Sequence, residues 1–525
     1  MDDPRLVRRG LAALLCWGVL FLSPAHAATD KIDLLHQAEQ LEQKGHWAEA
    51  ADKYEVIPPR ERSGDVRSRY LFCLRHVHLQ QRHNDATYQQ EALTLDLTTA
   101  VRAYGEVLGK LQGTYVDSKR AEIGRLFHEG MEELRLSLND DAFRQEYLPA
   151  TAPESIRAFI VRMGPTWGNQ PVRHRKDAER LVRDVALAAQ QALSLRAAIV
   201  VLEFASGACN NLDEYTYYLT PRQLDETYAS FKGEQVGVGI SDVAAEGEKL
   251  LVKNVMPGSP AGREGIQVDD RILRIDQKPV ESLSAESALE KLRGEPGTTV
   301  QLQVWIAATR QTRTLVLTRE AVLIPSVSPP QCLEPGIGYL QLTGFQETTV
   351  EEMQKAIQDL QLQGMKVLIL DLRGNPGGLF EAAIQIAERF LAEGVIVATH
   401  GQAESQNRTY QAGNASAVSI PLIVLIDGDT ASAAEVVAGA LKENHRATLV
   451  GQTTYGKGSV QCVVKLDTLP AGIRITLAKF FSPLGHAYQP GGVTPHIVVA
   501  QTPATFDNQR QAAVLEARQL LPIRR

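Results

Sequence analysis

The chain has 525 residues, of which 44% are hydrophobic, and its formal net charge is −7 at pH 7. A chain of this length can build about three domains with separate cores. The charge is mildly negative, and no run of five or more like charges occurs. These features exclude phosphate-driven nucleic-acid binding as a main function.

The N-terminus has the features of a secretory signal. Three arginines within residues 1–9 precede an apolar run over residues 10–22, and Ala25-His26-Ala27 supplies a small-x-small cleavage pattern. This order predicts a signal peptide over residues 1–27 and an exported protein, periplasmic or secreted. An uncleaved anchor is the alternative, although the apolar run is short for a membrane span. We expect no stable span in the mature chain, because no later stretch reaches about 18 apolar residues.

Cleavage after residue 27 would leave four cysteines: Cys73, Cys209, Cys332 and Cys462. Two disulfides and four reduced thiols both fit this number. No Cys-x-x-Cys motif occurs, and the one close histidine pair, His76-Val77-His78, has no neighbouring cysteine or carboxylate. We therefore predict no metal site and no cofactor.

Residues 28–90 are predicted to form a helical extension with a hairpin. Apolar positions recur at helical spacing, and Gly45 interrupts them. The pattern resembles one tetratricopeptide unit at Ala38, Gly45, Trp47, Ala50 and Tyr54. A second copy is not apparent, and one unit cannot bury its own face. An ordinary helical hairpin and a module that binds an adaptor protein both remain open.

Residues 91–232 continue as a predicted helical cap. The stretches 99–117 and 180–195 are amphipathic, and turn signals occur at Pro149, Pro153 and Gly164-Pro165. This region has the pattern of a cap and lacks that of a catalytic core.

Residues 233–322 change to short β-type runs separated by Gly, Pro and Asp. They resemble a PDZ domain in the circularly permuted form of bacterial proteases, on the stretches 236–240, 257–261, 269–273 and 294–298. Val236-Gly237-Val238-Gly239-Ile240 would bind a peptide, because glycines near a strand start leave N–H groups free for a terminal carboxylate. The alternative is a small β domain without a ligand.

Residues 323–503 alternate strands and helices after a Pro-rich connector at 325–336, which predicts an α/β core. The runs 366–372 and 421–427 are expected to be buried strands, and 433–444 a helix. Residues 504–525 are expected to form a C-terminal tail or helix.

Ser432 lies where the second of these strands leads into the helix. A side chain at such a junction can face the mouth of a site, and N–H groups at a helix N-terminus, here that of Ala433, stabilise developing negative charge. An ordinary N-capping serine is the alternative interpretation.

Lys457 follows 25 residues later, between Gly456 and Gly458. The glycines let the backbone bend tightly around the amine. A lysine acts as a base near pH 7 only if burial lowers its pKa by about 3 units. The absence of an acidic residue between Gly451 and Leu466 favours such an environment.

Two other kinds of site are alternatives for this region. The segment 451–458 is close to a phosphate-binding loop, but Gly458 replaces the required hydroxyl residue and the following residues alternate like a strand. A Ser-His-Asp triad would need His445 or His486, neither of which has a recognisable setting, and Ser432 lacks the Gly-x-Ser-x-Gly elbow.

Three motifs resemble those of the C-terminal processing peptidases, also called tail-specific or carboxyl-terminal proteases. They are residues 430–435, 451–461 and the upstream turn 371–378, in a likeness that spans roughly residues 95–500. The resemblance implies that Ser432 is the nucleophile and Lys457 the general base. It also implies that Gln461 orients the lysine and that Gly378 and Ala433 supply the oxyanion N–H groups. Glu435 is interpreted as structural.

The expected fold is a multidomain α+β protein. It would combine the helical N-terminal and cap regions, the circularly permuted PDZ-like domain and an α/β serine protease core of the kind in ClpP and crotonase. The expected function is an exported serine endopeptidase that cleaves proteins near their C-termini, with the PDZ-like domain binding the tail of the substrate. A catalytically silent PDZ scaffold that binds protein C-termini is the rival hypothesis.

Overall fold

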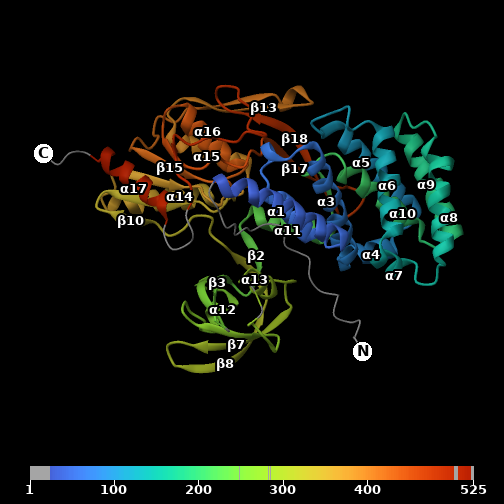
Figure 1. Ribbon diagram of the computed structural model, residues 1–525, viewed down its shortest axis with the longest axis horizontal. Helices are drawn as coiled ribbons and strands as arrows, with labels where there is room; N and C mark the ends of the chain where they lie inside the picture. The colour runs from blue at the N-terminus through green and yellow to red at the C-terminus, as the bar shows by residue number, and fades with distance from the viewer. Residues whose placement is uncertain (1–23, 248, 282, 284, 502–506, 522–525) are drawn as a thin grey trace. The chain divides into compact units, whose positions relative to one another are not determined.

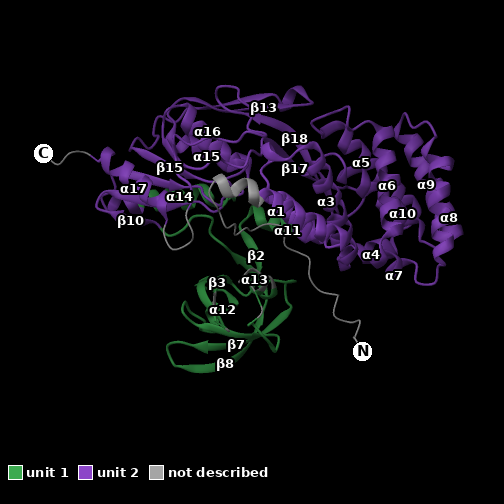
Figure 2. Ribbon diagram, in the orientation of Figure 1, with its two compact units in different colours: residues 1–18, 226–329, 344–358 green, residues 19–225, 330–343, 359–525 purple. Residues whose placement is uncertain are grey.

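The computed structural model describes residues 24–521, apart from residues 248, 282, 284 and 502–506 (Figure 1). The described residues divide into two compact units (Figure 2). The first comprises residues 226–329 and 344–358, and the second comprises the rest. The predicted signal peptide lies outside the described residues up to residue 23, and Pro24 begins helix α1 (Pro24–Gln43).

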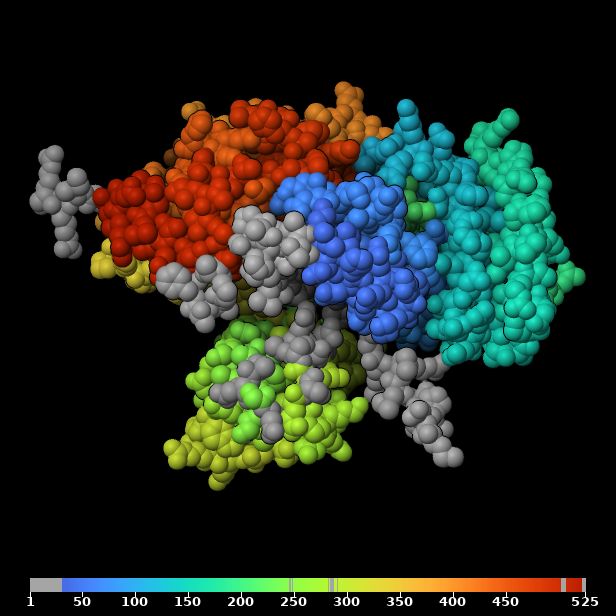
Figure 3. All heavy atoms as spheres, viewed as in Figure 1, coloured from blue at the N-terminus to red at the C-terminus, as the bar shows by residue number. Residues whose placement is uncertain are grey.

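The N-terminal extension is a group of helices in the second unit. Helix α1 turns at Gly45, whose φ is +74°, into α2 (Trp47–Val56). The turn η1 (Pro59–Glu61) then leads to α3 (Gly64–Asn84), which Ser63 caps by accepting a hydrogen bond from the Val66 N–H. Apolar side chains of the three helices are buried together. Figure 3 shows this blue segment against the red C-terminal part of the same unit.

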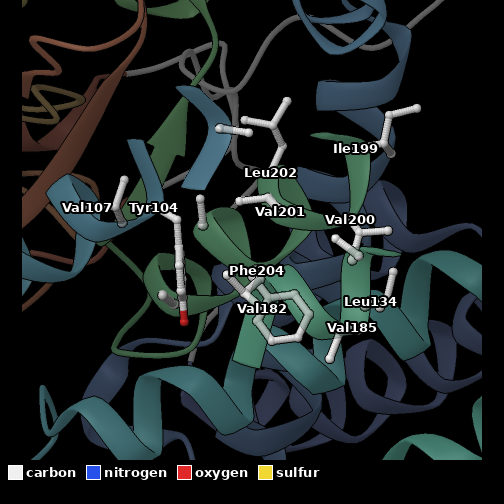
Figure 4. Close-up of a cluster of buried hydrophobic side chains, with 14 of the residues drawn as sticks. Tyr104, Val107, Leu134, Val182, Val185, Ile199, Val200, Val201, Leu202 and Phe204 are labelled. Carbon is white, nitrogen blue, oxygen red and sulfur yellow. The ribbon is translucent and has the colours of Figure 1, made fainter. Parts of the chain in front are cut away.

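The cap that follows is helical, as expected. Its elements are α4 (Ala86–Thr94), α5 (Leu97–Thr114), α6 (Ile123–Asn139), α7 (Asp141–Tyr147), α8 (Pro153–Met163), the π-helical turn η2 (Gly164–Gly168), α9 (Arg175–Leu193) and α10 (Ala197–Asn210). Helix α10 is mainly apolar and is buried along its length, with α5, α6 and α9 packed around it (Figure 4). Gly207 lets α10 approach α6 closely, because a Cβ at this position would lie 2.6 Å from the Glu129 carbonyl oxygen.

The cap ends in the strand β1 (Tyr217–Leu219) and α11 (Pro221–Phe231). Strand β1 pairs antiparallel with β18 (Gly472–Phe481), more than 250 residues later in the chain. The cap and the C-terminal part of the chain therefore share a β-sheet within the second unit.

The first unit is a small β domain. Strands β3 (Ile240–Glu246), β4 (Lys249–Val255), β5 (Arg271–Ile275), β7 (Thr299–Ile306) and β8 (Gln311–Thr318) form its main sheet in this order, with β6 (Lys278–Pro279) beside β5. Strands β2 (Glu234–Gly237) and β9 (Glu320–Leu323) form a separate pair. Helices α12 (Pro260–Arg263) and α13 (Ala285–Leu292) complete the domain, and α13 packs against β3. Among the described residues, β3 is paired on one side only.

The α/β core of the second unit contains a six-stranded sheet. Its order is β10 (Gln331–Glu334), β11 (Ile337–Gln341), β12 (Val367–Asp371), β15 (Leu422–Ile426), β16 (Thr448–Gly451) and β19 (Ile497–Val498). All neighbours after β10 pair in parallel. Every residue of β12 and β15 is buried, which explains their continuous apolar sequences.

Helices α14 (Thr349–Leu362), α15 (Phe380–Phe390) and α16 (Ala433–Glu443) lie between strands of this sheet in the chain order. Helix α17 (Asn508–Leu520) packs on the sheet. Helix α17 buries Ala513 and Ala517 against the sheet, so the C-terminal segment is part of the core packing.

A second sheet, antiparallel, packs on α15 and α16. Its order is β1, β18, β13 (Gly394–Gly401) and β14 (Arg408–Ala412), and β17 (Ser459–Lys465) also pairs with β18. The turn η3 (Glu404–Gln406) connects β13 and β14. Sequence analysis anticipated β17 and did not identify β13, β14 or β18.

The four cysteines Cys73, Cys209, Cys332 and Cys462 are free thiols. The two histidines of His76-Val77-His78 pack on aromatic rings: His76 stacks on Trp47 at 3.9 Å, and His78 lies 4.8 Å from the ring of Tyr217. Within residues 24–521 as described, no helix has the length and apolar character needed to cross a bilayer.

Candidate active site

Ser432 occupies a sharp turn between β15 and α16. Its φ and ψ are +57° and −117°, a conformation that L-residues avoid and that persists only when the surrounding structure enforces it. An ordinary N-capping serine has an extended backbone, so the backbone conformation of Ser432 differs from that of an ordinary N-cap. Its side chain is partly exposed, as a nucleophile requires.

The turn that precedes Ser432 is held by a dense set of hydrogen bonds. Thr430 donates from Oγ1 to the Leu372 carbonyl at 2.9 Å. Asp427 accepts from the N–H groups of Thr430 and Gly374, both at 3.0 Å. These bonds join the end of β15 to the turn after β12, and they fix the conformation that Ser432 must adopt.

The glycine turn at residues 374–378 lies directly beside the serine. The Ala431 N–H donates to the Asn375 carbonyl at 2.9 Å. A Cβ at Gly377 would lie 2.8 Å from Ser432 Cβ and 3.0 Å from the Ala433 nitrogen, so only glycine fits there. Gly378 follows in the same turn, and Ala433 begins α16, where an N–H has no intrahelical acceptor. The two N–H groups assigned to the oxyanion hole thus belong to adjacent segments.

Glu435 connects the serine to the lysine loop. Its fully buried carboxylate accepts four hydrogen bonds, from the Ser432 N–H, the Thr454 hydroxyl, the Gly456 N–H and the Lys457 N–H, at 2.6–2.8 Å. Burial raises the pKa of Glu435 to about 7, although the hydrogen bonds oppose this shift. Sequence analysis interpreted Glu435 as structural, and the structure makes it the direct link between residues 432 and 457.

The Lys457 amine lies in a setting that favours its neutral form. Burial lowers the pKa of Lys457 to about 7, and the Arg474 guanidinium acts in the same direction. The carboxylates of Glu55, Glu214 and Glu435 act against this shift. Lys457 Nζ lies 4.4 Å from the centroid of the Tyr215 ring. Desolvation is therefore the main cause of the lowered pKa of Lys457.

The structure does not join all predicted partners. Among the described residues, no hydrogen bond connects the Ser432 hydroxyl with the Lys457 amine, which rests over Tyr215. Gln461 donates from Nε2 to the Ser459 hydroxyl at 2.9 Å and to the Ser459 carbonyl at 3.2 Å. The side chain of Gln461 is thus directed to Ser459, at the start of the same strand β17.

The competing sites do not fit this geometry. Lys457 is followed by β17, whereas a phosphate-binding loop opens a helix. His486 pairs with Glu443 at the surface, and His445 has a φ of +54° just after α16. In the described part of the chain, neither histidine forms a hydrogen bond with Ser432.

Several residues around Lys457 were missed by sequence analysis. Tyr215 and Glu214 precede β1, Arg474 lies in β18, and Glu55 lies in α2. Each is far from Lys457 in the sequence, except Arg474, and none belongs to a local motif. Only the pairing of β1 with β18 brings Tyr215 to the site.

The segment predicted to bind peptides lines a small pocket in the first unit. Gly237, Val238, Gly239 and Ile240 contribute to it together with Leu292 and Arg293. Val236 lies outside this lining and pairs with Ala321 in the β2–β9 ladder. Gly239 has a φ of +83°, and a Cβ there would collide with the side chain of Ser259.

Comparison with known proteins identifies the two regions. The profile of peptidase family S41 matches residues 336–499, and that of the PDZ domain matches residues 227–305. A carboxyl-terminal-processing protease of Synechocystis sp. is 38% identical over 315 residues, which are 58% of this chain and 73% of that protein. The chain belongs to the carboxyl-terminal-processing proteases of family S41. It is a C-terminal processing serine protease with a PDZ domain.

Other members of the family are also similar. The protease of Bartonella bacilliformis is 35% identical over 56% of this chain and 68% of its own length. CtpA of Bacillus subtilis is 34% identical over 55% of this chain and 62% of its own length. Among solved structures, the photosystem II D1 C-terminal processing protease is 27% identical, with a TM-score of 0.40 over 76% of this chain and 93% of that chain.

The protease is a multidomain α+β protein with a helical N-terminal region, a PDZ domain and an S41 protease core. Its substrates are proteins with C-terminal tails. Both family profiles begin after residue 226, so neither covers the helical extension and most of the cap.

Proposed function

We propose that this protease works through a Ser–Lys dyad of Ser432 and Lys457. The observation that carries the proposal is the buried carboxylate of Glu435, which accepts hydrogen bonds from the backbone N–H groups of both residues. One carboxylate thereby links the backbone of the proposed nucleophile to that of the proposed base. The lowered pKa of Lys457 gives an amine that accepts a proton near neutral pH.

The reaction is an acyl transfer. Ser432 Oγ attacks the scissile carbonyl while its proton passes to Lys457 Nζ. The N–H groups of Gly378 and Ala433 stabilise the oxyanion of the tetrahedral intermediate. When the C–N bond breaks, Lys457 returns the proton to the leaving amine. Water then attacks the acyl-enzyme, with Lys457 again accepting and returning a proton, and releases the carboxylate product.

The lysine side chain must turn for this reaction. In the structure its amine lies over the Tyr215 ring, where a cation is favoured by the ring electrons. Deprotonation weakens that contact and frees the amine to hydrogen-bond the Ser432 hydroxyl. We assign to Gln461 the role of holding the turned amine, which requires its amide to exchange its bonds to Ser459.

The PDZ domain is proposed to bind the C-terminal tail of the substrate along β3. Among the residues that the structure describes, the edge of this strand beside α13 is unpaired, and an extended peptide can add to such an edge. The segment Val236–Ile240 runs from the end of β2 to the first residue of β3, and residues 237–240 line the adjacent pocket. The N–H groups of this glycine-rich segment are suited to a terminal carboxylate.

Finer features of the architecture are part of the same proposal. We assign residues 28–90 to the extension, 91–232 to the cap, 233–322 to a circularly permuted PDZ domain, 323–503 to a catalytic domain of the ClpP and crotonase kind, and 504–525 to a C-terminal segment. Residues 1–27 are assigned to a signal peptide, which implies an exported protease.

The first test uses a protein substrate with an unstructured apolar C-terminal tail. Ser432→Ala removes the nucleophile, so cleavage is expected to fall at least about 10³-fold while the tail remains bound. Lys457→Ala is expected to lose activity to a similar degree and to retain tail binding. Product formation by mass spectrometry and tail binding by fluorescence anisotropy measure the two effects.

Equal cleavage by the Ser432→Ala variant and the parent protein would overturn the nucleophile and leave the silent scaffold as the better account. Substantial activity in Lys457→Ala alone would show that another group is the base. The Ser432→Ala variant also serves as a trap, because substrates that it retains in the cell envelope can be identified.

A further inference from the structure

The N-terminal extension contacts the loop that carries the proposed base. Arg60 donates from Nη1 to the Thr454 carbonyl at 3.0 Å, although the two residues are 394 positions apart. Arg62 donates from Nη2 to the Tyr455 hydroxyl at 2.7 Å. Both arginines lie in the connection between α2 and α3, and both acceptors lie in the loop that ends at Lys457. Figure 3 shows this blue segment beside the red segments of the core.

Arg62 is itself rigidly held. Its guanidinium also donates to the carbonyls of Ile57 at 2.7 Å and Glu55 at 2.9 Å. It lies 4.6 Å from the centroid of the Tyr70 ring and 5.7 Å from that of Tyr455. A guanidinium that serves three acceptors between two rings uses the planar geometry that is specific to arginine.

The loop at residues 452–458 has no regular secondary structure, so its position depends on such contacts. Glu435 holds it from within the core through Thr454, Gly456 and Lys457. Arg60 and Arg62 hold it from the side of the extension. The lysine loop is therefore fixed on two sides, and one of them is supplied by the extension.

The extension also places a charge near the base. The Glu55 carboxylate, in the last turn of α2, interacts electrostatically with both Arg62 and the Lys457 amine. The other charged groups that face this amine come from different elements: Arg474 of β18, Glu435 of α16, and Glu214, which precedes β1.

We propose that the N-terminal extension completes the active site from within the same chain, with Arg60, Arg62 and Glu55 as positioning residues for Lys457. This inference rests on the proposed role of Lys457 as the base. The extension therefore has a role in catalysis beyond that of a helical hairpin or an adaptor-binding module. Its removal would release one side of the loop at residues 452–458.

Arg62→Lys tests the positional part in the full-length protein. Lysine keeps the charge and loses the planar fork, so the loop should shift. We expect kcat to fall about 10–100-fold, because small misplacements of a catalytic group have effects of this size. KM is expected to change less than about twofold, since tail binding is assigned to the PDZ domain. Arg69→Lys is the matched control, because Arg69 pairs with Glu39 and Glu42 inside the extension.

Glu55→Gln tests the electrostatic part. Removing this carboxylate removes a charge that favours the protonated amine, so the acidic limb of the pH–rate profile should move to lower pH. A purely structural role for Glu55 would leave the limb in place. Glu49→Gln, an exposed position in the same helix, is the control and should leave the limb unchanged.

The outcomes separate the two proposals. If Lys457→Ala keeps its activity, the dyad is wrong and this inference fails with it. If Lys457→Ala is inactive but Arg62→Lys and Glu55→Gln behave like the parent protein, the dyad stands and the positioning role is wrong. A folding defect is recognised by thermal unfolding, and Glu55→Gln, which keeps the shape of the side chain, then decides the question by its pH profile.

Discussion

At the scale of single residues, the site combines two features that are costly for folding. Ser432 has a backbone conformation that non-glycine residues avoid. Lys457 keeps its amine where burial disfavours the charged form. Because the pKa of Lys457 is lower in the folded chain, the unfolded chain binds more protons between pH 7 and about 10.4, and the stability contributed by this group rises with pH over that window.

The same shift predicts the pH dependence of cleavage. Only the neutral amine can accept the proton of Ser432, so kcat/KM should rise with pH and reach half of its plateau near pH 7. Initial rates between pH 5 and 9 with a tail substrate measure this profile. Tail binding by the Ser432→Ala variant is the control for pH effects outside the chemistry. A rate that is constant over this range would contradict the assignment of Lys457.

Local sequence was sufficient to predict the candidate site residues that lie in one stretch of the chain. Ser432, Ala433 and Glu435 lie within one helical turn, and Lys457 is marked by its flanking glycines. Tyr215, Glu55 and Arg62 could not be found in this way, because pairing of β1 with β18 and docking of the extension bring them to the lysine from distant positions. The resting contact of Gln461 with Ser459 was also beyond sequence, since it depends on side-chain rotamers.

At the scale of elements, buried strands and amphipathic helices were predictable and the antiparallel sheet was not. The run at β15 is purely apolar, that at β12 is apolar up to its last residue, Asp371, and both are flanked by turns, so their type was clear. Strands β13 and β18 mix buried and exposed positions. Besides their hairpin partners β14 and β17, they pair with each other, and β18 pairs with β1, far away in the chain. Their pairing is therefore a product of tertiary packing that local periodicity does not record.

The open edge of β3 leads to a prediction for the PDZ domain. If the domain recognises a terminal carboxylate, an amidated tail should bind at least about tenfold more weakly than the free acid, because a charge-assisted hydrogen bond is lost. Anisotropy titration of the Ser432→Ala protein with matched peptides measures this difference. Equal affinities would show that the domain binds tails without reading their ends.

At the scale of the whole molecule, a buried ionic network joins helix α3 of the extension to the cap and stabilises the cap. Arg82 bonds Glu203 at 2.7 Å and Glu133 at 3.1 Å, and none of the three side chains is more than 3% exposed. Burial alone would raise the pKa of Glu203, but Arg82 and His83 lower it well below its usual range. The contribution of the ionised Glu203 carboxylate to the stability of the folded chain is therefore present above about pH 5 and is lost as the pH falls.

Removal of the central cation should destabilise the cap severely. Arg82→Ala leaves the buried Glu203 carboxylate without its arginine, whereas Glu133 keeps its pair with Arg75, and we expect a cost of about 3–5 kcal/mol. Arg157→Ala removes an exposed ion pair with Glu154 and should cost less than about 1 kcal/mol. Denaturant unfolding followed by circular dichroism compares the two variants, and similar midpoints would contradict the importance of the network.

The ladder between β1 and β18 has a mechanical consequence. Because the helical cap contributes a strand to the sheet that also holds β17, it cannot swing away like a hinged lid without tearing backbone hydrogen bonds. The cap and the catalytic core should accordingly unfold in a single cooperative transition. Limited proteolysis by an added protease should not cleave the chain early between them. Any movement that admits a polypeptide to Ser432 is then expected in segments other than the cap, which stays fixed relative to the sheet.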